Sequence, residues 1–217
     1  MTSVFALECP PVATWCYMVS SPDTGTAYVI DAPYQSAQYV LAEAARLGVQ
    51  ITDILLTHTH WDHTADCRAI QDATGARVVV HHDDLYRLAD PMKHTIWPLP
   101  FVIQPVETVY CITNDTSLIT PSGGMPPLRV LHTPGHTEGG VCFVDDSTQR
   151  VFAGDTLFAG SVGRVDLPGG DEETLIRSIR EVLFLLDDTF QVFPGHGPTT
   201  TIGHERTTNP FVGEAAR

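Results

Sequence analysis

The sequence predicts an α/β fold in a single domain that spans residues 1–217. The length of 217 residues fits one large domain or two small ones. The content of 43% hydrophobic and 18% charged residues is typical of a globular chain with a sizeable core. Short apolar runs that suit strands alternate with segments whose composition and end signals suit helices.

The bulk properties exclude several kinds of partner. A formal net charge of −14, with only 12 Lys and Arg, argues against a nucleic-acid ligand. The 5 cysteines include no Cys-x-x-Cys pair and favour a reducing compartment. No signal peptide is recognisable, and no apolar run approaches the ~18 residues that a spanning helix needs. We therefore expect a cytoplasmic protein without a membrane partner, and the sequence does not indicate its oligomeric state.

The first half of the chain is predicted to alternate strands and helices. The predicted strands are Val4–Leu7, Thr14–Val19, Ala27–Ile30, Ile51–Leu56 and Arg77–His81. The predicted helices are Ser36–Leu47, Thr64–Thr74 and a short one from His81 to about Ala89. Gly48 and Gly75 mark the ends of the first two helices. His81 and His82 could suggest a second metal site, but Asp83 and Asp84 equally fit the charges of a helix N-terminus.

The second half begins with the least regular stretch, Asp90–Pro105, which contains four prolines. Such a segment is expected at the surface, as a rim or lid over a site. Trp97 and Phe101 could line that rim, although a packing role is the favoured interpretation. The strands predicted after it are Leu118–Ile119, Leu128–Leu131, Gly140–Val144, Arg150–Ala153 and Gln191–Phe193. Asp171–Leu186 predicts an amphipathic helix with three acidic residues in its first turn.

A dense cluster of polar side chains follows the apolar run that ends at Leu56. Thr57-His58-Thr59-His60-Trp61-Asp62-His63 places three histidines and one aspartate within six residues. Imidazole and carboxylate groups bind zinc and also iron. Packing four such groups together without a cation would be costly. The segment therefore predicts a metal site at the end of a strand.

Further candidate ligands also sit where predicted strands end: His136, Asp155 and His196. Two divalent cations ~3.5–4 Å apart need several ligands each, with one carboxylate able to bridge them. One predicted set is His58, His60 and His136; the other is Asp62, His63 and His196, and Asp155 is the predicted bridge. Asp31 also ends a strand, where a turn-forming role and a functional role are about equally expected. His132 is interpreted as structural.

Five segments carry a resemblance to a known family. They are Thr57–His63, Thr133–Thr137, Gly154–Phe158, Gly163–Asp171 and Pro194–Pro198, and the closing stretch Gly203–Phe211 also fits. With these segments the chain resembles the metallo-β-lactamase superfamily, and within it the short, single-domain glyoxalase II-like hydrolases. The resemblance implies a four-layer αββα sandwich with the metal site at one edge of the two sheets. It also implies that Asp31 lies behind a metal-bound histidine.

The resemblance further implies thioester hydrolysis, typically of S-D-lactoylglutathione. A water bridging two zinc ions would lose a proton near neutral pH and attack the thioester carbonyl, with Asp155 holding both ions and Asp62 orienting the nucleophile. Iron or manganese could replace zinc in one or both positions. This sequence ends where the long enzymes continue into a C-terminal helical domain, and it carries Gly163-Arg164-Val165-Asp166 where they have a Lys and a Tyr that hold glutathione. The expected partner is therefore a small-molecule thioester, with glutathione recognition left open.

Three other functions remain open from the sequence. A persulfide dioxygenase of the same superfamily would use one iron on a face of His58, His136 and Asp155. A lactonase could use the same dinuclear site. A non-enzymatic metal-binding module is the third alternative, although seven ligands with open positions exceed what a structural metal needs.

Overall fold

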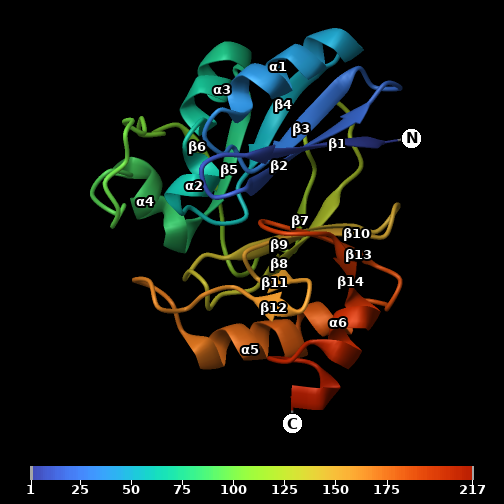
Figure 1. The fold of residues 1–217 in the computed structure, drawn as a ribbon. Coiled ribbons are helices and arrows are strands. Elements are labelled where there is room, and N and C mark those ends of the chain that lie inside the picture. The colour runs from blue at the N-terminus through green and yellow to red at the C-terminus, as the bar shows by residue number, and fades with distance from the viewer. Residues whose placement is uncertain (1, 217) are drawn as a thin grey trace. The chain divides into compact units, whose positions relative to one another are not determined.

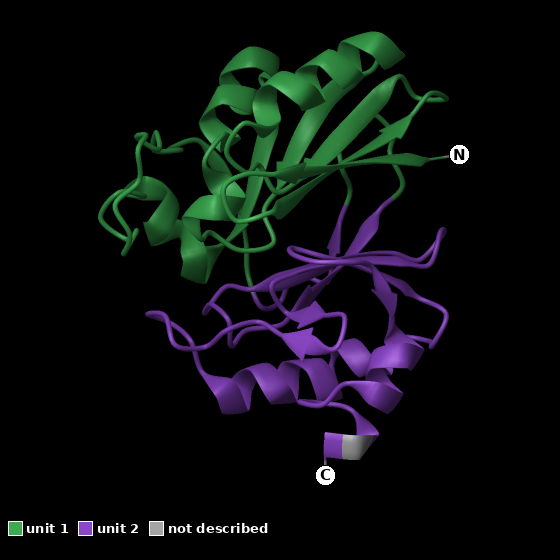
Figure 2. Cartoon of the chain, viewed as in Figure 1, with its two compact units in different colours: residues 1–113, 120–126 green, residues 114–119, 127–217 purple. Residues whose placement is uncertain are grey.

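The structure is a computed structural model that describes residues 2–216. The chain divides into two compact units, which Figure 2 shows in different colours. Unit 1 comprises residues 1–113 and 120–126, and unit 2 comprises residues 114–119 and 127–217. Each unit contains one six-stranded sheet with its own helices. The assignment of residues 1–217 to one domain stays a prediction.

The sheet of unit 1 has the strand order β1-β2-β3-β4-β5-β6. Its strands are β1 (Ser3–Cys9), β2 (Thr14–Ser21), β3 (Thr26–Ile30), β4 (Gln50–Leu55), β5 (Arg77–His81) and β6 (Val109–Ile112). The first three strands pair antiparallel, and β3 to β6 pair parallel. The carboxyl ends of parallel strands share one sheet edge, so the loops after β3 and β4 emerge together.

Helices cover one face of this sheet. α1 (Ser36–Leu47) and α3 (Cys67–Thr74) lie over it in Figure 1. Val40 and Ala44 of α1 and Ile70 of α3 pack in one apolar core with alternate residues of β2 to β5. The predicted bounds of α1 are confirmed, and Gly48 ends it in the left-handed conformation with a φ of 67°.

The helix predicted over Thr64–Thr74 is two helices, so this prediction was wrong in its start. α2 (Trp61–Thr64) is one turn long, and α3 begins after Asp66. The Asp66 amide donates to the Ala32 carbonyl at 2.9 Å, and its carboxylate accepts from the Ala37 amide at 2.9 Å. These tertiary bonds replace helical ones. A 3₁₀ turn (His82–Asp84) then precedes α4 (Leu85–Ala89).

The sheet of unit 2 has the strand order β14-β13-β10-β9-β8-β7. Its strands are β7 (Leu118–Ile119), β8 (Leu128–His132), β9 (Val141–Asp145), β10 (Arg150–Gly154), β13 (Gln191–Pro194) and β14 (Thr200–Thr201). Only β10 and β13 pair parallel among these neighbours. A separate hairpin joins β11 (Leu157–Phe158) to β12 (Ser161–Val162). The sequence indicated neither β6, β14 nor this hairpin.

Two helices, α5 (Glu172–Glu181) and α6 (Ile202–Thr208), pack on this sheet. Both appear on the same side of it in Figure 1. The prediction that α5 continues to Leu186 was wrong, because the chain passes into a 3₁₀ turn at Leu183–Leu185 that buries Leu183. The predicted start is confirmed: the Asp171 carboxylate accepts from the Thr174 amide at 2.7 Å as an N-cap. A last 3₁₀ turn spans Glu214–Ala216.

The helices of residues 2–216 are short, and α1 is 12 residues long. None of those described combines the length and hydrophobicity that crossing a bilayer requires.

Candidate metal centre

The ligand loop of unit 1 is fixed by Asp31, which directly follows β3. One Asp31 oxygen accepts from the Thr57 amide at 2.8 Å, and the other accepts from the Thr57 hydroxyl at 2.7 Å. Asp31 is buried and has a φ of 57°, an uncommon conformation for a residue other than glycine. Backbone strain of this kind persists where the surroundings impose it, often at functional sites. Asp31 thus fixes the residue that precedes His58.

Asp31 also orients His63. The Nδ1 atom of His63 lies 2.7 Å from Asp31 Oδ2, and both side chains are buried. A carboxylate at Nδ1 keeps the proton on that nitrogen, so Nε2 has a free lone pair that can bind a cation. His63 Nε2 lies 3.6 Å from Asp62 Oδ2, and this Asp62 oxygen accepts from the Thr14 hydroxyl at 2.9 Å. Two adjacent candidate ligands are therefore held by groups from β2 and β3.

A second carboxylate, Asp84, supports the residue between His58 and His60. The Thr59 amide donates to Asp84 Oδ2 at 3.0 Å, and the Thr59 hydroxyl donates to the Asp84 carbonyl at 2.9 Å. Asp84 is buried and binds the buried Arg87 guanidinium at 2.9 Å. A buried charge needs such a partner. The Asp84–Arg87 pair thereby fixes the loop from behind.

The three candidate ligands of unit 2 come from three separate strand ends. His136 follows β8, Asp155 follows β10 and His196 follows β13. Asp155 Oδ2 lies 3.6 Å from His136 Nε2 and 3.5 Å from His196 Nε2. One carboxylate oxygen thus stands beside the Nε2 atoms of two histidines.

These distances fit metal ligation within each unit. Two atoms that are each ~2.1 Å from one cation, at tetrahedral angles, lie ~3.4 Å apart. The separations of 3.6 Å from His63 to Asp62, 3.6 Å from His136 to Asp155 and 3.5 Å from His196 to Asp155 are near this value. The donors are imidazole nitrogens and carboxylate oxygens, which suit zinc, iron and manganese. The residues present therefore fit a divalent metal.

Main-chain groups support the ligands of unit 2. His136 Nδ1 donates a hydrogen bond to the Arg164 carbonyl oxygen at 2.7 Å, which keeps the proton on Nδ1 and leaves the lone pair of Nε2 for a cation. A Cβ at Gly163 would lie 1.8 Å from the Asp155 carbonyl oxygen, so only glycine allows this approach. The Arg164 side chain turns away and binds Asp166 through two hydrogen bonds of 2.7 and 2.8 Å. Arg164 and Asp166 thus pair with each other at this loop.

Within unit 1 the structure brings together Asp31, His58, His60, Asp62 and His63 on the loops after β3 and β4. Within unit 2 it brings together His136, Asp155 and His196. The sharing of cations between these two groups stays a prediction. His132 has its Nε2 atom 3.1 Å from the Glu138 carbonyl oxygen, which agrees with a structural role.

The cysteines are packing residues rather than nucleophiles where they are buried. Burial raises the pKa of the Cys142 thiol to about 11 and also raises the pKa of the Cys16 and Cys67 thiols. The thiolate is the reactive form, so these thiols are inert near neutral pH. Cys67 accordingly packs in the core of unit 1.

Thr14 and Asp84 were missed in the sequence as supports of the site. Thr14 opens β2 and lies 48 positions before Asp62, and Asp84 lies 25 positions after Thr59. Their local sequence contains only a strand start and an acidic helix start, so no nearby pattern could indicate these contacts.

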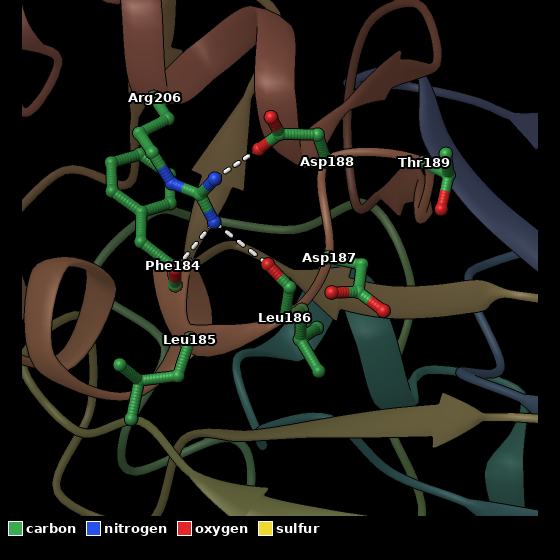
Figure 3. A pocket seen from close by; sticks show the side chains of 7 residues that line it. All are labelled: Phe184, Leu185, Leu186, Asp187, Asp188, Thr189 and Arg206. Atoms are coloured by element: carbon green, nitrogen blue, oxygen red, sulfur yellow. Dashed lines mark hydrogen bonds and ion pairs between the residues drawn. The ribbon is translucent and has the colours of Figure 1, made fainter.

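A surface hollow of ≈ 680 Å³ in unit 2 is lined by none of the candidate ligands. Figure 3 shows Arg206 of α6 pointing toward the 3₁₀ turn after α5, where it binds the Phe184 and Leu186 carbonyl oxygens and pairs with Asp188. Arg206 is thus committed to holding α6 against this turn. Its neighbour Glu205 is buried and accepts from the Gly160 amide at 2.9 Å.

The fold and the candidate ligands place the chain in a known family. The family model of the metallo-beta-lactamase superfamily matches residues 9–205, and the chain belongs to this superfamily. Its members are mostly metal-dependent hydrolases, and the predicted membership and fold class are confirmed.

Individual proteins sharpen this assignment. The chain is 33% identical over 192 residues to hydroxyacylglutathione hydrolase GloC of Haemophilus influenzae, covering 88% of this chain and 89% of the relative. The crystal structure of BLEG-1 B3 metallo-beta-lactamase aligns with a TM-score of 0.88 at 31% identity, over 98% of this chain and 99% of that one. TTHA1623, crystallised in a di-iron-bound form, aligns with a TM-score of 0.83 at 34% identity, over 96% and 100%.

Proposed function

We propose that the chain is a dinuclear metal-dependent thioester hydrolase of the hydroxyacylglutathione type. The observation that carries the proposal is the position of Asp155 Oδ2, 3.6 Å from His136 Nε2 and 3.5 Å from His196 Nε2. In the proposed site these histidines would hold different cations, so a carboxylate beside both could bind to both. The relative named a hydroxyacylglutathione hydrolase supports the substrate class.

Each candidate residue has a separate role in the proposed site. His58, His60 and His136 would hold one cation, Asp62, His63 and His196 would hold the other, and Asp155 would bind both. When bound, the cations supply a water that is acidic enough to act as a nucleophile near neutral pH and polarise the carbonyl under attack. Asp62, which is held by the Thr14 hydroxyl, would orient the attacking water. Asp31 keeps His63 in the tautomer that binds through Nε2.

The direct test removes Asp155. Protein purified without added metal is analysed for metal content and assayed with S-D-lactoylglutathione by the loss of the thioester absorbance. We expect the wild type to carry two metal ions and to hydrolyse the thioester, and Asp155→Ala to lose both properties. Asp146→Ala is the matched control, because Asp146 is an exposed carboxylate of the same unit that binds only Arg129 in the described contacts. Full activity of Asp155→Ala with normal metal content would end the dinuclear account.

The same preparation distinguishes the other functions. A persulfide dioxygenase would carry one iron and consume oxygen with glutathione persulfide, whereas the proposed hydrolase carries two metals and consumes none. A lactonase would cleave lactones faster than thioesters. A metal-loaded protein inert toward all three substrates would favour the binding module.

A further inference from the structure

The segment between α4 and β6 is an ordered loop that is anchored near both ends. The His94 amide and the Thr95 hydroxyl both bond to the Pro91 carbonyl oxygen, at 3.3 and 2.9 Å. At the other end Ile103 is buried, and its amide lies 3.4 Å from the Met92 sulfur. The intervening residues 96–102 form the tip of this loop, which is held at its base on both sides.

The tip exposes apolar side chains. Ile96 is 56% exposed, Trp97 43% and Val102 69%. Single exposed apolar residues are ordinary, but several on one anchored segment indicate a surface that contacts something apolar. Figure 1 shows this segment, in green, looping out beside α4.

Phe101 of the tip connects the loop to the candidate metal ligands. Its ring stacks on Tyr34, with centroids 3.9 Å apart and planes 3° from parallel, and lies 6.1 Å from the Trp61 ring. We call Tyr34, Trp61 and Phe101 the aromatic wall. All three are partly exposed. Trp61 stands between His60 and Asp62, and Tyr34 follows Asp31 by three positions, so the wall is built on the two loops that carry the ligands of unit 1.

The charges of unit 1 favour apolar contact as the selective force at this wall. Its four arginines each bind a carboxylate: Arg46 with Glu43, Arg68 with Asp72, Arg77 with Asp53 and Arg87 with Asp84. Its single lysine, Lys93, is exposed at the base of the loop, outside the tip. Flat aromatic faces instead bind planar apolar groups by stacking and edge contacts. The group bound here would stand next to the reacting carbonyl, because Trp61 is adjacent in sequence to two proposed metal ligands.

We propose that the aromatic wall binds the acyl part of the thioester and selects acyl groups that carry a planar apolar substituent, such as a phenyl ring. This inference rests on the proposed function, which it deepens by naming the substrate class. Phe101 is a specificity-determining residue in this proposal, since it joins the loop tip to the two ligand-bearing loops.

The kinetic test compares S-mandeloylglutathione with S-D-lactoylglutathione, two hydroxyacyl thioesters that differ by a phenyl ring in place of a methyl group. We expect the wild type to have the higher kcat/KM for the mandeloyl ester. Phe101→Ala should lower kcat/KM for that ester by about tenfold and for the lactoyl ester by less than about twofold, because only the former loses ring contact. Tyr39→Ala is the matched control, since Tyr39 is 51% exposed on α1 outside the wall. Equal losses for both esters, or no loss, would overturn the proposal.

A binding experiment separates this inference from the proposed function. Calorimetric titration of the zinc-loaded chain with S-benzylglutathione and S-methylglutathione needs no turnover. We expect the wild type to bind the benzyl compound more tightly than the methyl compound. Phe101→Ala should lose this difference in affinity. Phe101→Leu should keep part of it, because leucine retains apolar volume at the position and should fold even where alanine does not. Selective binding without thioester hydrolysis would refute the proposed hydrolase function but support the proposed selectivity of the aromatic wall. Hydrolysis with no selectivity in kinetics or binding would refute the wall alone, and failure of both would refute both.

Discussion

The two groups of candidate ligands, one in each unit, are supported in different ways. In unit 1 the ligands lie on one continuous segment, the loop after β4 and the helix α2, and buried carboxylates hold it: Asp31 binds His63, and Asp84 binds Thr59. In unit 2 the ligands come from three strand ends, and the main chain holds His136 through the Arg164 carbonyl oxygen. Side-chain support can be removed by one substitution, whereas main-chain support cannot. The comparison therefore predicts that removing a supporting side chain weakens the site in unit 1, whereas removing the Arg164 side chain in unit 2 leaves the supporting carbonyl group in place.

The largest effect is expected from Asp84→Ala. This change removes the carboxylate that binds the buried Arg87 guanidinium and the Thr59 amide. Removing one partner of a buried ion pair costs about 3–5 kcal/mol, so the free energy of unfolding, measured with urea, should fall by about that much. Asp84→Asn is the companion variant, because it keeps an acceptor for Thr59 and should recover part of the loss. If both variants were as stable as the wild type, the Asp84 carboxylate would not stabilise the ligand loop, contrary to this prediction.

A smaller effect is expected from Asp31→Asn, which should act on metal binding. Asp31 accepts from the Thr57 amide, the Thr57 hydroxyl and His63 Nδ1, and an amide offers one oxygen to these three donors. Loss of a group that orients a metal-bound histidine typically lowers metal affinity by about 10–100-fold. Competition with a zinc chelator measures this, with Asp146→Asn as the control. Unchanged zinc affinity would mean that His63 needs no carboxylate behind it.

The smallest effect is expected from Arg164→Ala in unit 2. The main-chain oxygen that binds His136 remains, and the exposed pair with Asp166 is lost. Zinc affinity should therefore match the wild type in the same chelator competition, in contrast to Asp31→Asn. A loss of zinc affinity as large as that of Asp31→Asn would contradict the difference between the two groups of candidate ligands.

The Arg164–Asp166 pair also predicts a pH dependence. The hydrogen bond from Arg164 lowers the pKa of the Asp166 carboxyl to about 2, below its ordinary value near ~3.9. Whatever this pair adds to stability is present above pH ~4 and disappears as pH falls through about 2. Arg164→Ala should accordingly differ from the wild type only above this window, and only slightly, since exposed ion pairs contribute little.

The contrast between the two groups of candidate ligands also explains what could be predicted from the sequence. Local signals were sufficient where the cause is local: the spacing of His58 to His63, and Gly48 at the end of α1. They failed where a distant partner decides. The helix predicted from Thr64 breaks because Asp66 bonds to Ala32, and α5 ends at Glu181 without a glycine or proline to mark it. Asp84 acts through Thr59, a contact that no local pattern contains.

The three ligands of unit 2 lay between these cases. His136, Asp155 and His196 are each unremarkable as single residues. They could be grouped because each follows a predicted strand and because the dense motif at His58–His63 had already indicated a metal. The main-chain support around them could not be predicted, since a carbonyl group carries no sequence signal.

The central claim is that seven side chains hold two cations with Asp155 as the shared ligand. The most direct measurement is the number of zinc ions bound per chain at equilibrium in the wild type and in Asp155→Ala, by elemental analysis after dialysis against a defined free-zinc concentration. The account predicts two ions in the wild type and loss of both in the variant. One ion in the wild type, or two retained in Asp155→Ala, would contradict it.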